Sequence, residues 1–236
     1  MASDDEYRVA MSGRWFLAFS FLLLAVHEAH ELAHAIAGRL LCGEWPVRDF
    51  NSWHFTSDCA SWLPTASGPA FSYALMLAGG LIAARAGTPS RWAGVALIFA
   101  ANPFARLFTA VMGGGDEMVV GQRMAGLSTR TPALRIIVAA VVALLCIAAI
   151  AAGWHGIAGL KRRGLWFTVV LLWPMVLTGV GLFVLGNGLL RANVLVSPAI
   201  AGAPLLVYLV SALAAVLAAM TGRWLVPRRA ADPAFS

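Results

Sequence analysis

Long apolar runs, separated by short polar segments, dominate the hydrophobic pattern of this chain. A helix that crosses the hydrocarbon core of a bilayer needs about 20 mostly apolar residues. Tryptophans stand at several run ends, where indole rings favour the headgroup layer. The pattern therefore predicts an all-α integral membrane protein, a polytopic bundle of about six transmembrane helices. The six runs are Trp15–Leu41, Pro69–Arg85, Trp92–Met112, Leu134–Trp154, Trp166–Leu190 and Ala199–Trp224.

Composition supports lipid rather than water as the surroundings of this chain. Of its 236 residues, 60% are hydrophobic and 12% are charged, whereas soluble domains have about 45–50% and about 25%. A globule of this size cannot bury so much apolar surface, so the lipid bilayer must cover the rest. The formal net charge of +6 comes from scattered basic residues. They form no basic stripe with aromatics of the kind that binds nucleic acid, and we expect no nucleic-acid partner.

Basic residues near the span ends indicate orientation, because cytoplasmic loops carry an excess of Lys and Arg. The side with both termini carries ten such residues, and the opposite side carries six. This excess predicts that both termini face the cytoplasm, and we expect the protein in a bacterial cytoplasmic membrane. The ten are Arg8, Arg14, Arg85, Arg91, Lys161, Arg162, Arg163, Arg223, Arg228 and Arg229; the six are Arg39, Arg48, Arg123, Arg130, Arg135 and Arg191.

The connection Gly43–Ser67 is too aromatic for a solvated linker and too irregular for a helix, with Trp45 and Trp53 among its residues. We interpret it as a hairpin or re-entrant loop after the first span. Such a loop must lean on the helices, because backbone polar groups at membrane depth need partners. Cys42 and Cys59 share this region, and they can form a disulfide if it faces an oxidising compartment.

The first span contains five ionisable residues, each costing at least about 2.5–3.5 kcal/mol at membrane depth. At 100° per residue, four of the five, all except Glu28, fall within an arc of about 100° on one helix face. One face of a lipid-embedded helix is therefore a cluster of metal-type ligands. The five are His27, Glu28, His30, Glu31 and His34.

Residues 30–34 read His-Glu-Leu-Ala-His, an H-E-x-x-H pattern. Two histidines at i and i+4 of a helix can bind one metal ion, and the glutamate between them can act on a metal-bound water. The pattern predicts His30 and His34 as metal ligands and Glu31 as the catalytic general base. The alternative is a hydrogen-bonded His/Glu network that only holds helices together.

These residues resemble the H-E-x-x-H motif of the site-2 protease family of intramembrane zinc metalloproteases. The segment Ser67-Gly68-Pro69-Ala70-Phe71-Ser72 is similar to that family's second core span, with Ser72 where asparagine is usual. The aromatic connection also stands where the family has a membrane-associated hairpin. The resemblance covers about residues 15–127. It implies a three-span catalytic core, a Zn²⁺ cofactor, and a membrane-protein substrate cleaved in or near a transmembrane segment.

The resemblance also implies a third metal ligand, an aspartate in the third core span. The family motif that supplies it is absent, and the chain instead has Asn102-Pro103 followed by Gly113-Gly114-Gly115-Asp116-Glu117. Three glycines allow backbone conformations that a helix forbids, so the chain can bend back toward the metal. We expect Asp116 as the third ligand. The alternatives are Glu117 as the ligand, or Asp116 as a helix cap at the membrane surface.

Three further polar residues are candidates for the same site. Arg106 follows Asn102 by four residues, so both can face the bundle interior. Arg106 can pair with Glu28 or Asp116, or stabilise the oxyanion formed during peptide attack. Asn102 is a candidate for contact with the substrate or the oxyanion. His27 is a candidate partner of a ligand, or a polar group that lines the path to the site.

The chain thus divides into a cytoplasmic N-terminal tail (1–14), a metalloprotease-like three-span core (15–127), three additional spans (128–225) and a C-terminal tail (226–236). We expect a zinc metalloendopeptidase, either alone, as a homo-oligomer or with an accessory subunit. A metal-ion transporter and a non-catalytic membrane metal-binding protein are the alternatives. A membrane di-iron oxygenase needs about eight histidines, and the chain has five.

Overall fold

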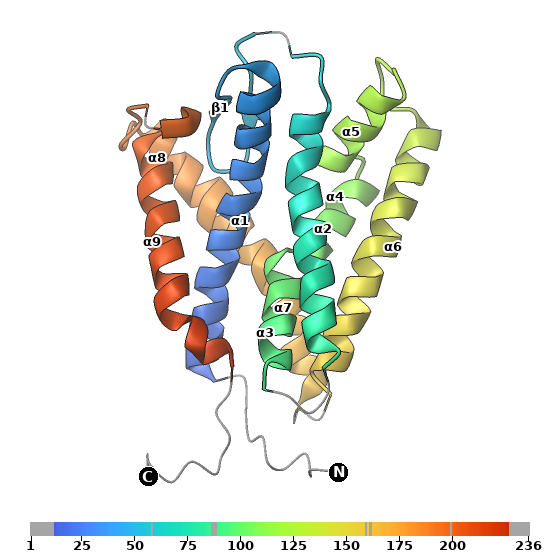
Figure 1. The fold of residues 1–236 in the computed structure, drawn as a ribbon, viewed down its shortest axis with the longest axis vertical. Helices are drawn as coiled ribbons and strands as arrows, with labels where there is room; N and C mark the ends of the chain where they lie inside the picture. Colours follow the sequence, from blue (N-terminus) through green and yellow to red (C-terminus); the bar gives the residue numbers. More distant parts are fainter. Residues whose placement is uncertain are drawn as a thin grey trace.

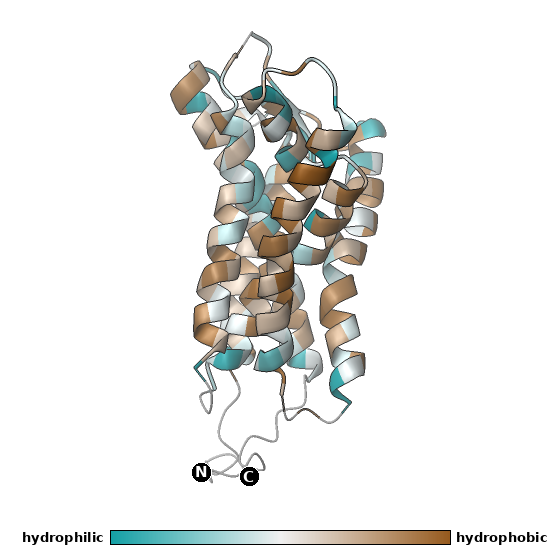
Figure 2. Ribbon diagram, turned by 90° about the vertical axis from the view of Figure 1, so that its right-hand side faces the viewer, coloured by the Kyte–Doolittle hydropathy of each residue, from teal (hydrophilic) through white to brown (hydrophobic). Residues whose placement is uncertain are grey.

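The computed structural model describes residues 12–57, 59–85, 89–158, 160, 162–198 and 200–226. Most of the two expected tails lies outside the described residues, as do Arg8, Lys161, Arg228 and Arg229. The expected fold is confirmed: among the described residues, six helical segments are long and apolar enough to cross a membrane, and the chain is an all-α polytopic membrane protein (Figure 1). Hydrophilic residues gather at the two ends of the helices, and hydrophobic residues lie between them (Figure 2).

The six spans lie close to the expected apolar runs, but the second and sixth spans begin at residues other than the expected ones. The second span begins before the expected Pro69, because Pro64 in its first turn needs no partner for a backbone N–H. The sixth begins late, because Ala201 in the preceding 3-10 turn has a left-handed φ of 55°. The spans are Gly13–Cys42, Leu63–Ala83, Arg91–Val111, Pro132–Gly156, Arg163–Arg191 and Leu205–Leu225.

Several spans consist of more than one element. The elements are, in chain order, α1 (Gly13–Cys42), β1 (Val47–Arg48), β2 (Trp53–His54), α2 (Leu63–Ala83), α3 (Arg91–Ala100), α4 (Pro103–Val111), α5 (Asp116–Met124), α6 (Pro132–Gly156), α7 (Arg163–Val176), the π-helix η2 (Leu177–Gly186), α8 (Asn187–Arg191), the 3-10 helix η3 (Ile200–Gly202), α9 (Leu205–Thr221) and the 3-10 helix η4 (Gly222–Leu225).

The third span breaks into α3 and α4 at Asn102-Pro103. Pro103 has no N–H to continue the hydrogen-bond ladder of α3, so the helix is interrupted there. Asn102 adopts a left-handed φ of 56°, and its side-chain oxygen accepts a hydrogen bond from the backbone N–H of Ala105 at 3.4 Å. That bond caps α4 and fixes the direction in which its residues enter the bundle.

The fifth span also departs from a regular α-helix. After α7 it forms a π-helix of ten residues, η2, and then continues as α8. Pro174 removes one backbone donor from the last turn of α7, and the glycines of η2 offer little steric resistance to a wider turn. π-Helical segments often accompany functional sites, and η2 lines the cavity described below.

α1 lies between α2 and α9, with the other helices grouped around them (Figure 1). The close contact of α2 with α3 depends on glycine: a Cβ on Gly94 would lie 2.6 Å from the carbonyl oxygen of Gly79. Small residues let helix backbones approach in this way inside a membrane. The hairpin, α5 and α8 lie at one end of the bundle, and the start of α1 and η4 lie at the other (Figure 1).

The connection after the first span is a hairpin, as expected. Strands β1 and β2 pair antiparallel, with Val47 opposite His54 and Arg48 opposite Trp53. Phe50 at the tip is 3% exposed, and it packs among side chains of the fifth and sixth spans. The hairpin therefore enters the bundle rather than lying on its surface.

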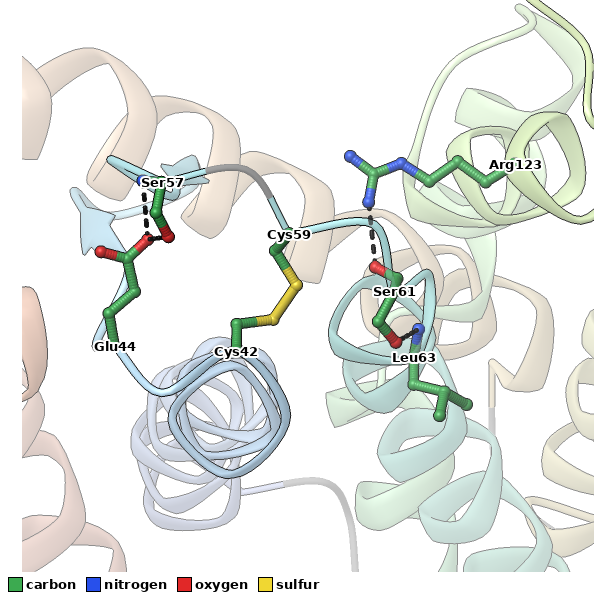
Figure 3. The surroundings of a disulfide bond; sticks show 7 residues. All are labelled: Cys42, Glu44, Ser57, Cys59, Ser61, Leu63 and Arg123. Atoms are coloured by element: carbon green, nitrogen blue, oxygen red, sulfur yellow. Dashed lines mark hydrogen bonds between the residues drawn. A yellow bond between two sulfur atoms is a disulfide. The ribbon is translucent and has the colours of Figure 1, made fainter.

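A disulfide between Cys42 and Cys59 closes this connection at the end of α1, with the two Cα atoms 5.7 Å apart (Figure 3). The pairing that the sequence leaves open is thus present. Glu44 accepts hydrogen bonds from Thr56 Oγ1 at 2.6 Å and from Ser57 N and Oγ at 2.9 and 2.7 Å. These hydrogen bonds lower the pKa of Glu44 to about 2.

Candidate metal centre

One face of α1 carries the H-E-x-x-H residues into the interior of the bundle. His30, Glu31 and His34 are 8%, 6% and 1% exposed. The i, i+4 spacing stacks the two histidines one turn apart on the same face. Their rings meet edge to face with centroids 4.7 Å apart, and their Nε2 atoms lie 3.1 Å from each other.

The carbonyl group of Pro64, in the first turn of α2, fixes the orientation of His34. The Nδ1 atom of His34 lies 2.7 Å from Pro64 O. A carbonyl oxygen can only accept, so Nδ1 carries the ring hydrogen and donates it. Nε2 is therefore left as the atom that can bind a metal, which is the usual arrangement for a metal-ligating histidine.

α2 approaches both histidines closely because Gly68 has no side chain. A Cβ at this position would lie 2.7 Å from His30 Cε1 and would overlap His34 Nε2. Any larger residue here would displace the imidazole rings. The Ser67-Gly68-Pro69 segment that carries part of the family resemblance thus lies directly at the site.

Asp116 reaches the two histidines because the chain reverses between α4 and α5. Gly113 and Gly115 have φ values of 76° and 82°, which favour glycine, so the reversal expected from the sequence is present. Asp116 Oδ2 lies 3.3 Å from His30 Nε2 and 3.4 Å from His34 Nε2. Burial raises the pKa of the Asp116 carboxyl, but the hydrogen bonds and charges of the histidines lower it by more, to below its usual range.

The three ligand atoms have the spacing of one face of a tetrahedral zinc site. Zinc–ligand bonds of about 2.0–2.1 Å separate tetrahedral ligand atoms by about 3.3–3.4 Å, and the observed separations are 3.1, 3.3 and 3.4 Å. Within the described ranges, His30, His34 and Asp116 are the one group of three such residues that could hold a metal ion. Two histidines and one carboxylate also form a catalytic zinc donor set. The residues therefore fit zinc.

Glu31 lines a cavity of about 500 Å³ beside these ligands. Its Oε2 atom is buried and has no hydrogen-bond partner among the described residues. Buried polar atoms are nearly always paired, so such an exception needs an explanation. The walls come from α1, α4 and η2 and include Leu23, Val26, Ala105, Phe108, Thr178 and Phe183.

A second cavity, of about 510 Å³, lies between the hairpin and α5. Trp53 and His54 of β2 line it on one side, and Arg123 of α5 lines it on another. Asn51 and Asp116 line both cavities. Asp116, one of the three candidate ligands, therefore borders both cavities.

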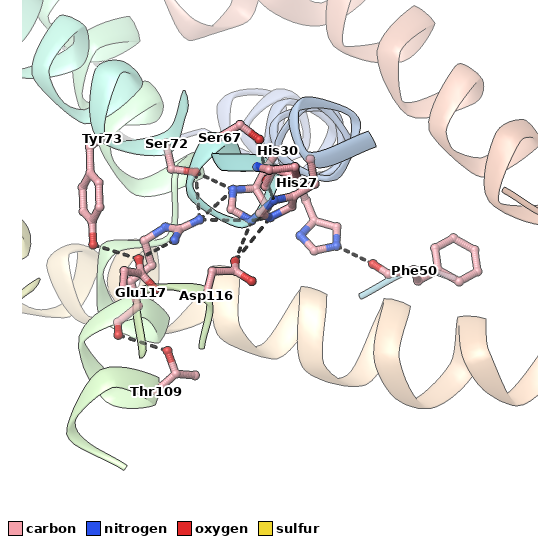
Figure 4. Close-up of polar contacts among 12 residues, drawn as sticks. His27, His30, Phe50, Ser67, Ser72, Tyr73, Thr109, Asp116 and Glu117 are labelled. Carbon is pink, nitrogen blue, oxygen red and sulfur yellow. Dashed lines mark hydrogen bonds and ion pairs between the residues drawn. The ribbon is translucent and has the colours of Figure 1, made fainter. Parts of the chain in front are cut away.

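The hairpin tip obtains its hydrogen bonds from the first and fifth spans. His27 Nε2 lies 2.8 Å from Phe50 O (Figure 4), and Phe50 N donates to Asn187 Oδ1 at 3.3 Å. Asn187 Nδ2 in turn donates to Asn51 Oδ1 at 2.5 Å. His27 thus borders the cavity and holds the hairpin, and it stands outside the three-residue group.

The charge partner of Arg106 differs from the expected ones. A pair with Glu28 or Asp116 was one of the alternatives, beside a role at the oxyanion, and that pair is wrong: Arg106 Nη1 donates to Glu117 Oε1 at 2.7 Å. Glu28 pairs instead with Arg48 of the hairpin at 2.5 Å. Consecutive helix residues point about 100° apart, so when Asp116 faces the histidines Glu117 faces α4.

Other residues predicted for the site also lie beside it. Asn102 and Arg106 line the 500 Å³ cavity with Glu31, although Asn102 uses its side-chain oxygen to cap α4. Trp53 and Asn51 border the site as well, but they stand in no motif and the sequence does not reveal them. Ser72, which stands where the resembled family usually has asparagine, lies 3.0 Å from His30 through its hydroxyl, but no sequence pattern assigns it a role in the site.

No protein-family model, curated protein or solved structure matches this chain. The fold and the site define a polytopic all-α membrane protein with a buried group of two histidines and one aspartate that could hold a metal ion. The resemblance to site-2 proteases rests on the motif residues and on the position of the aromatic connection.

Proposed function

We propose that this protein is an intramembrane zinc metalloprotease that hydrolyses peptide bonds in or near transmembrane segments of client proteins. One observation carries the proposal. The ligand atoms of His30, His34 and Asp116 lie within 3.4 Å of one another, beside the unpartnered carboxylate oxygen of Glu31. Ionisable groups within a membrane span are costly and usually functional.

His30, His34 and Asp116 would hold the zinc ion. When bound, zinc polarises a peptide carbonyl and lowers the pKa of a water molecule to about 7. The hydrogen bond from His34 Nδ1 to Pro64 O keeps its Nε2 available as a ligand. Asp116 contributes the negative charge of the donor set.

Glu31 would move the proton. As general base its carboxylate accepts a proton from the attacking water, and as general acid it returns that proton to the leaving amine, so the glutamate is regenerated. Its Oε2 atom has no hydrogen-bond partner among the described residues, and Glu31 lines the cavity that a substrate would occupy. Arg106 has a buried Nε without a partner among the described residues, and it lines the same cavity, which supports a role in binding a substrate carbonyl.

The position of the cavity supports a membrane-protein substrate. Most of its walls belong to membrane-spanning helices and include the small residues Ala100, Ala101, Ala105 and Gly179. A helical substrate shields its own backbone carbonyls, so it must unwind locally before hydrolysis. Small wall residues leave room for an extended backbone. We expect kinked or glycine-rich segments to be cleaved in preference to regular helices.

The metal can be tested on purified protein in detergent. Elemental analysis should find about one zinc per chain, as expected for a three-ligand catalytic site. The double variant His30→Ala/His34→Ala should lose most of it. Full zinc retention by this variant would remove both histidines from the site.

Glu31→Gln tests the reaction separately. Glutamine is nearly isosteric with glutamate but cannot accept the proton, so the variant should keep zinc and lose cleavage of a reconstituted membrane substrate by about 10²–10⁴-fold. Equal cleavage rates would contradict the general-base role. A wild-type protein that binds zinc and cleaves no membrane substrate would support the non-catalytic or transporter alternative.

We also propose that both termini face the cytoplasm of a bacterial cell and that the hairpin faces outward. The ten-to-six distribution of basic residues supports this orientation. So does the Cys42–Cys59 disulfide at the hairpin end, because disulfides persist in oxidising compartments. In intact cells of a Cys146→Ser variant, an impermeant maleimide should label the protein only after an impermeant reductant is added. An absence of labelling after reduction would contradict the orientation.

A further inference from the structure

A hydroxyl, a guanidinium and a carboxylate form a chain of contacts on the Nδ1 side of His30 (Figure 4). Ser72 Oγ, on α2, lies 3.0 Å from His30 Nδ1, and the serine is only 2% exposed. Arg106 Nη2 donates to Ser72 Oγ at 2.9 Å, and Nη1 donates to Glu117 Oε1 at 2.7 Å. Tyr73 donates its hydroxyl hydrogen to the same Glu117 oxygen at 2.8 Å.

The hydrogen-bond partner of His30 Nδ1 decides whether Nε2 of the same ring can bind a metal. A neutral histidine binds a metal through Nε2 only when its ring hydrogen is on Nδ1, and that hydrogen then needs an acceptor. Two groups contact His30 Nδ1: Ser72 Oγ at 3.0 Å and Arg106 Nη2 at 2.7 Å. A guanidinium has donors and no acceptor. Ser72 Oγ is therefore the one acceptor for this hydrogen among the described residues.

We propose that Ser72 is a positioning residue for the candidate metal centre: its hydroxyl oxygen accepts the Nδ1 hydrogen of His30, and the Arg106–Glu117 pair holds that hydroxyl in place. This inference rests on the proposed function. It assigns a role to the serine that replaces the asparagine of the resembled family.

Arg106 also competes with Ser72 for His30 Nδ1: its Nη2 lies 2.7 Å from that atom, closer than Ser72 Oγ at 3.0 Å, and a guanidinium can only donate. When Arg106 donates to Nδ1, the ring hydrogen is on Nε2 and the metal-binding lone pair is lost, so metal binding requires the tautomer in which Nδ1 donates to Ser72. Glu117 and Ser72 offer the two Nη atoms other acceptors. The side chains of Arg106 and Glu117 are 12% and 11% exposed, so their contacts are shielded from water.

His34 provides the comparison within the same site. Its Nδ1 hydrogen goes to the backbone carbonyl of Pro64, which no side-chain substitution removes. His30 depends on a side-chain hydroxyl, which a single substitution removes. A single side-chain substitution can therefore remove the hydrogen-bond acceptor of His30 but not that of His34.

The test uses the full chain purified in detergent, with Co²⁺ as the probe. Its affinity is measured by competition with a chelator, and its d–d absorption reports the geometry of the ligands. Ser72→Ala should bind Co²⁺ about 10–100-fold more weakly, the usual cost of losing a hydrogen-bond partner of a ligand, with an altered spectrum. Ser72→Thr keeps the hydroxyl and should restore both.

Thr221→Val is the matched control. Thr221 is also buried, at 6% exposure, and its hydroxyl donates to Leu217 O within α9. This variant loses a buried hydroxyl away from the site and should leave Co²⁺ binding unchanged. Arg106→Met/Glu117→Gln removes the charged pair and leaves the Ser72 hydroxyl, so it should lose less affinity than Ser72→Ala.

Wild-type affinity and spectrum in Ser72→Ala would overturn the inference, and so would a larger loss in the Arg106→Met/Glu117→Gln variant than in Ser72→Ala. In both cases the metal centre itself would stand. A wild-type protein that binds no Co²⁺ would instead overturn the proposed metal centre, and this inference with it.

Discussion

The indole ring of Trp53 lies against the imidazole ring of His34, with centroids 5.1 Å apart and ring planes inclined by 31°. Trp53 belongs to β2 of the hairpin and His34 to α1. The hairpin therefore forms one wall of the candidate metal centre. It contributes to the site through a packed aromatic ring rather than through a ligand.

Trp53→Ala should weaken zinc binding about two- to tenfold, because an aromatic pair contributes about 0.5–1.5 kcal/mol. Trp53→Phe keeps a stacked ring and should lose less. Trp45→Ala serves as the control, since Trp45 lies on the same connection and is 40% exposed. Zinc affinity measured by chelator competition shows whether Trp53→Ala loses more affinity than Trp53→Phe and Trp45→Ala. Equal losses in Trp45→Ala and Trp53→Ala would attribute the effect to the hairpin as a whole.

Asp116→Asn should release zinc while leaving the fold intact. Asp116 is the first residue of α5, whose N-cap is Gly115 with no side-chain cap hydrogen bond. The amide therefore leaves the start of α5 in place but carries no negative charge for the metal. Elemental analysis after dialysis, with circular dichroism as the check on folding, separates the two effects. Near-wild-type zinc content would remove Asp116 from the metal site.

Glu28→Gln should destabilise the protein more than the double variant Glu28→Gln/Arg48→Met. The Arg48 side chain is 1% exposed and that of Glu28 is 13% exposed, so removing one partner leaves a buried charge at a cost of about 3–5 kcal/mol. Removing both charges avoids that cost. Unfolding free energies measured in detergent check the comparison. If the double variant lost as much stability as the sum of its two single variants, Glu28 and Arg48 would not be a coupled pair.

Glu44 should make the stability of the hairpin depend on pH. Its pKa is about 2 in the folded protein and 4.5 ordinarily, so its contribution is complete above about pH 4.5 and disappears as the pH falls toward 2. The difference in thermal midpoint between wild type and Glu44→Gln should therefore be largest near pH 6 and should shrink below pH 4.5. A difference that stays constant down to pH 3 would contradict this assignment.

The spans could be predicted from the sequence because lipid imposes both length and composition on a crossing helix. The shared face of His30 and His34 follows from helical geometry alone. Pro103 marked the break in the third span, and three glycines marked the reversal before Asp116. Each of these features depends only on residues within one helix or one turn, so the local sequence is enough to predict it.

The charge partners could not be predicted, because they depend on how distant segments pack. Arg48 meets Glu28 only because the hairpin folds back onto α1. Glu117 rather than Asp116 meets Arg106 because α5 begins at Asp116, and one residue of shift would exchange the two acids. The contact of Trp53 with His34 likewise depends on the depth at which the hairpin enters the bundle.

The hydrogen bond from Phe50 N to Asn187 Oδ1 joins residues 137 positions apart in the chain. A ribosome delivers α1 and the hairpin long before it delivers the fifth span. The tip of the hairpin therefore cannot obtain this partner until synthesis has passed Asn187. During biosynthesis the helix with the histidines is present early, while the wall that Trp53 forms is secured late, so the site matures only when most of the chain has been translated.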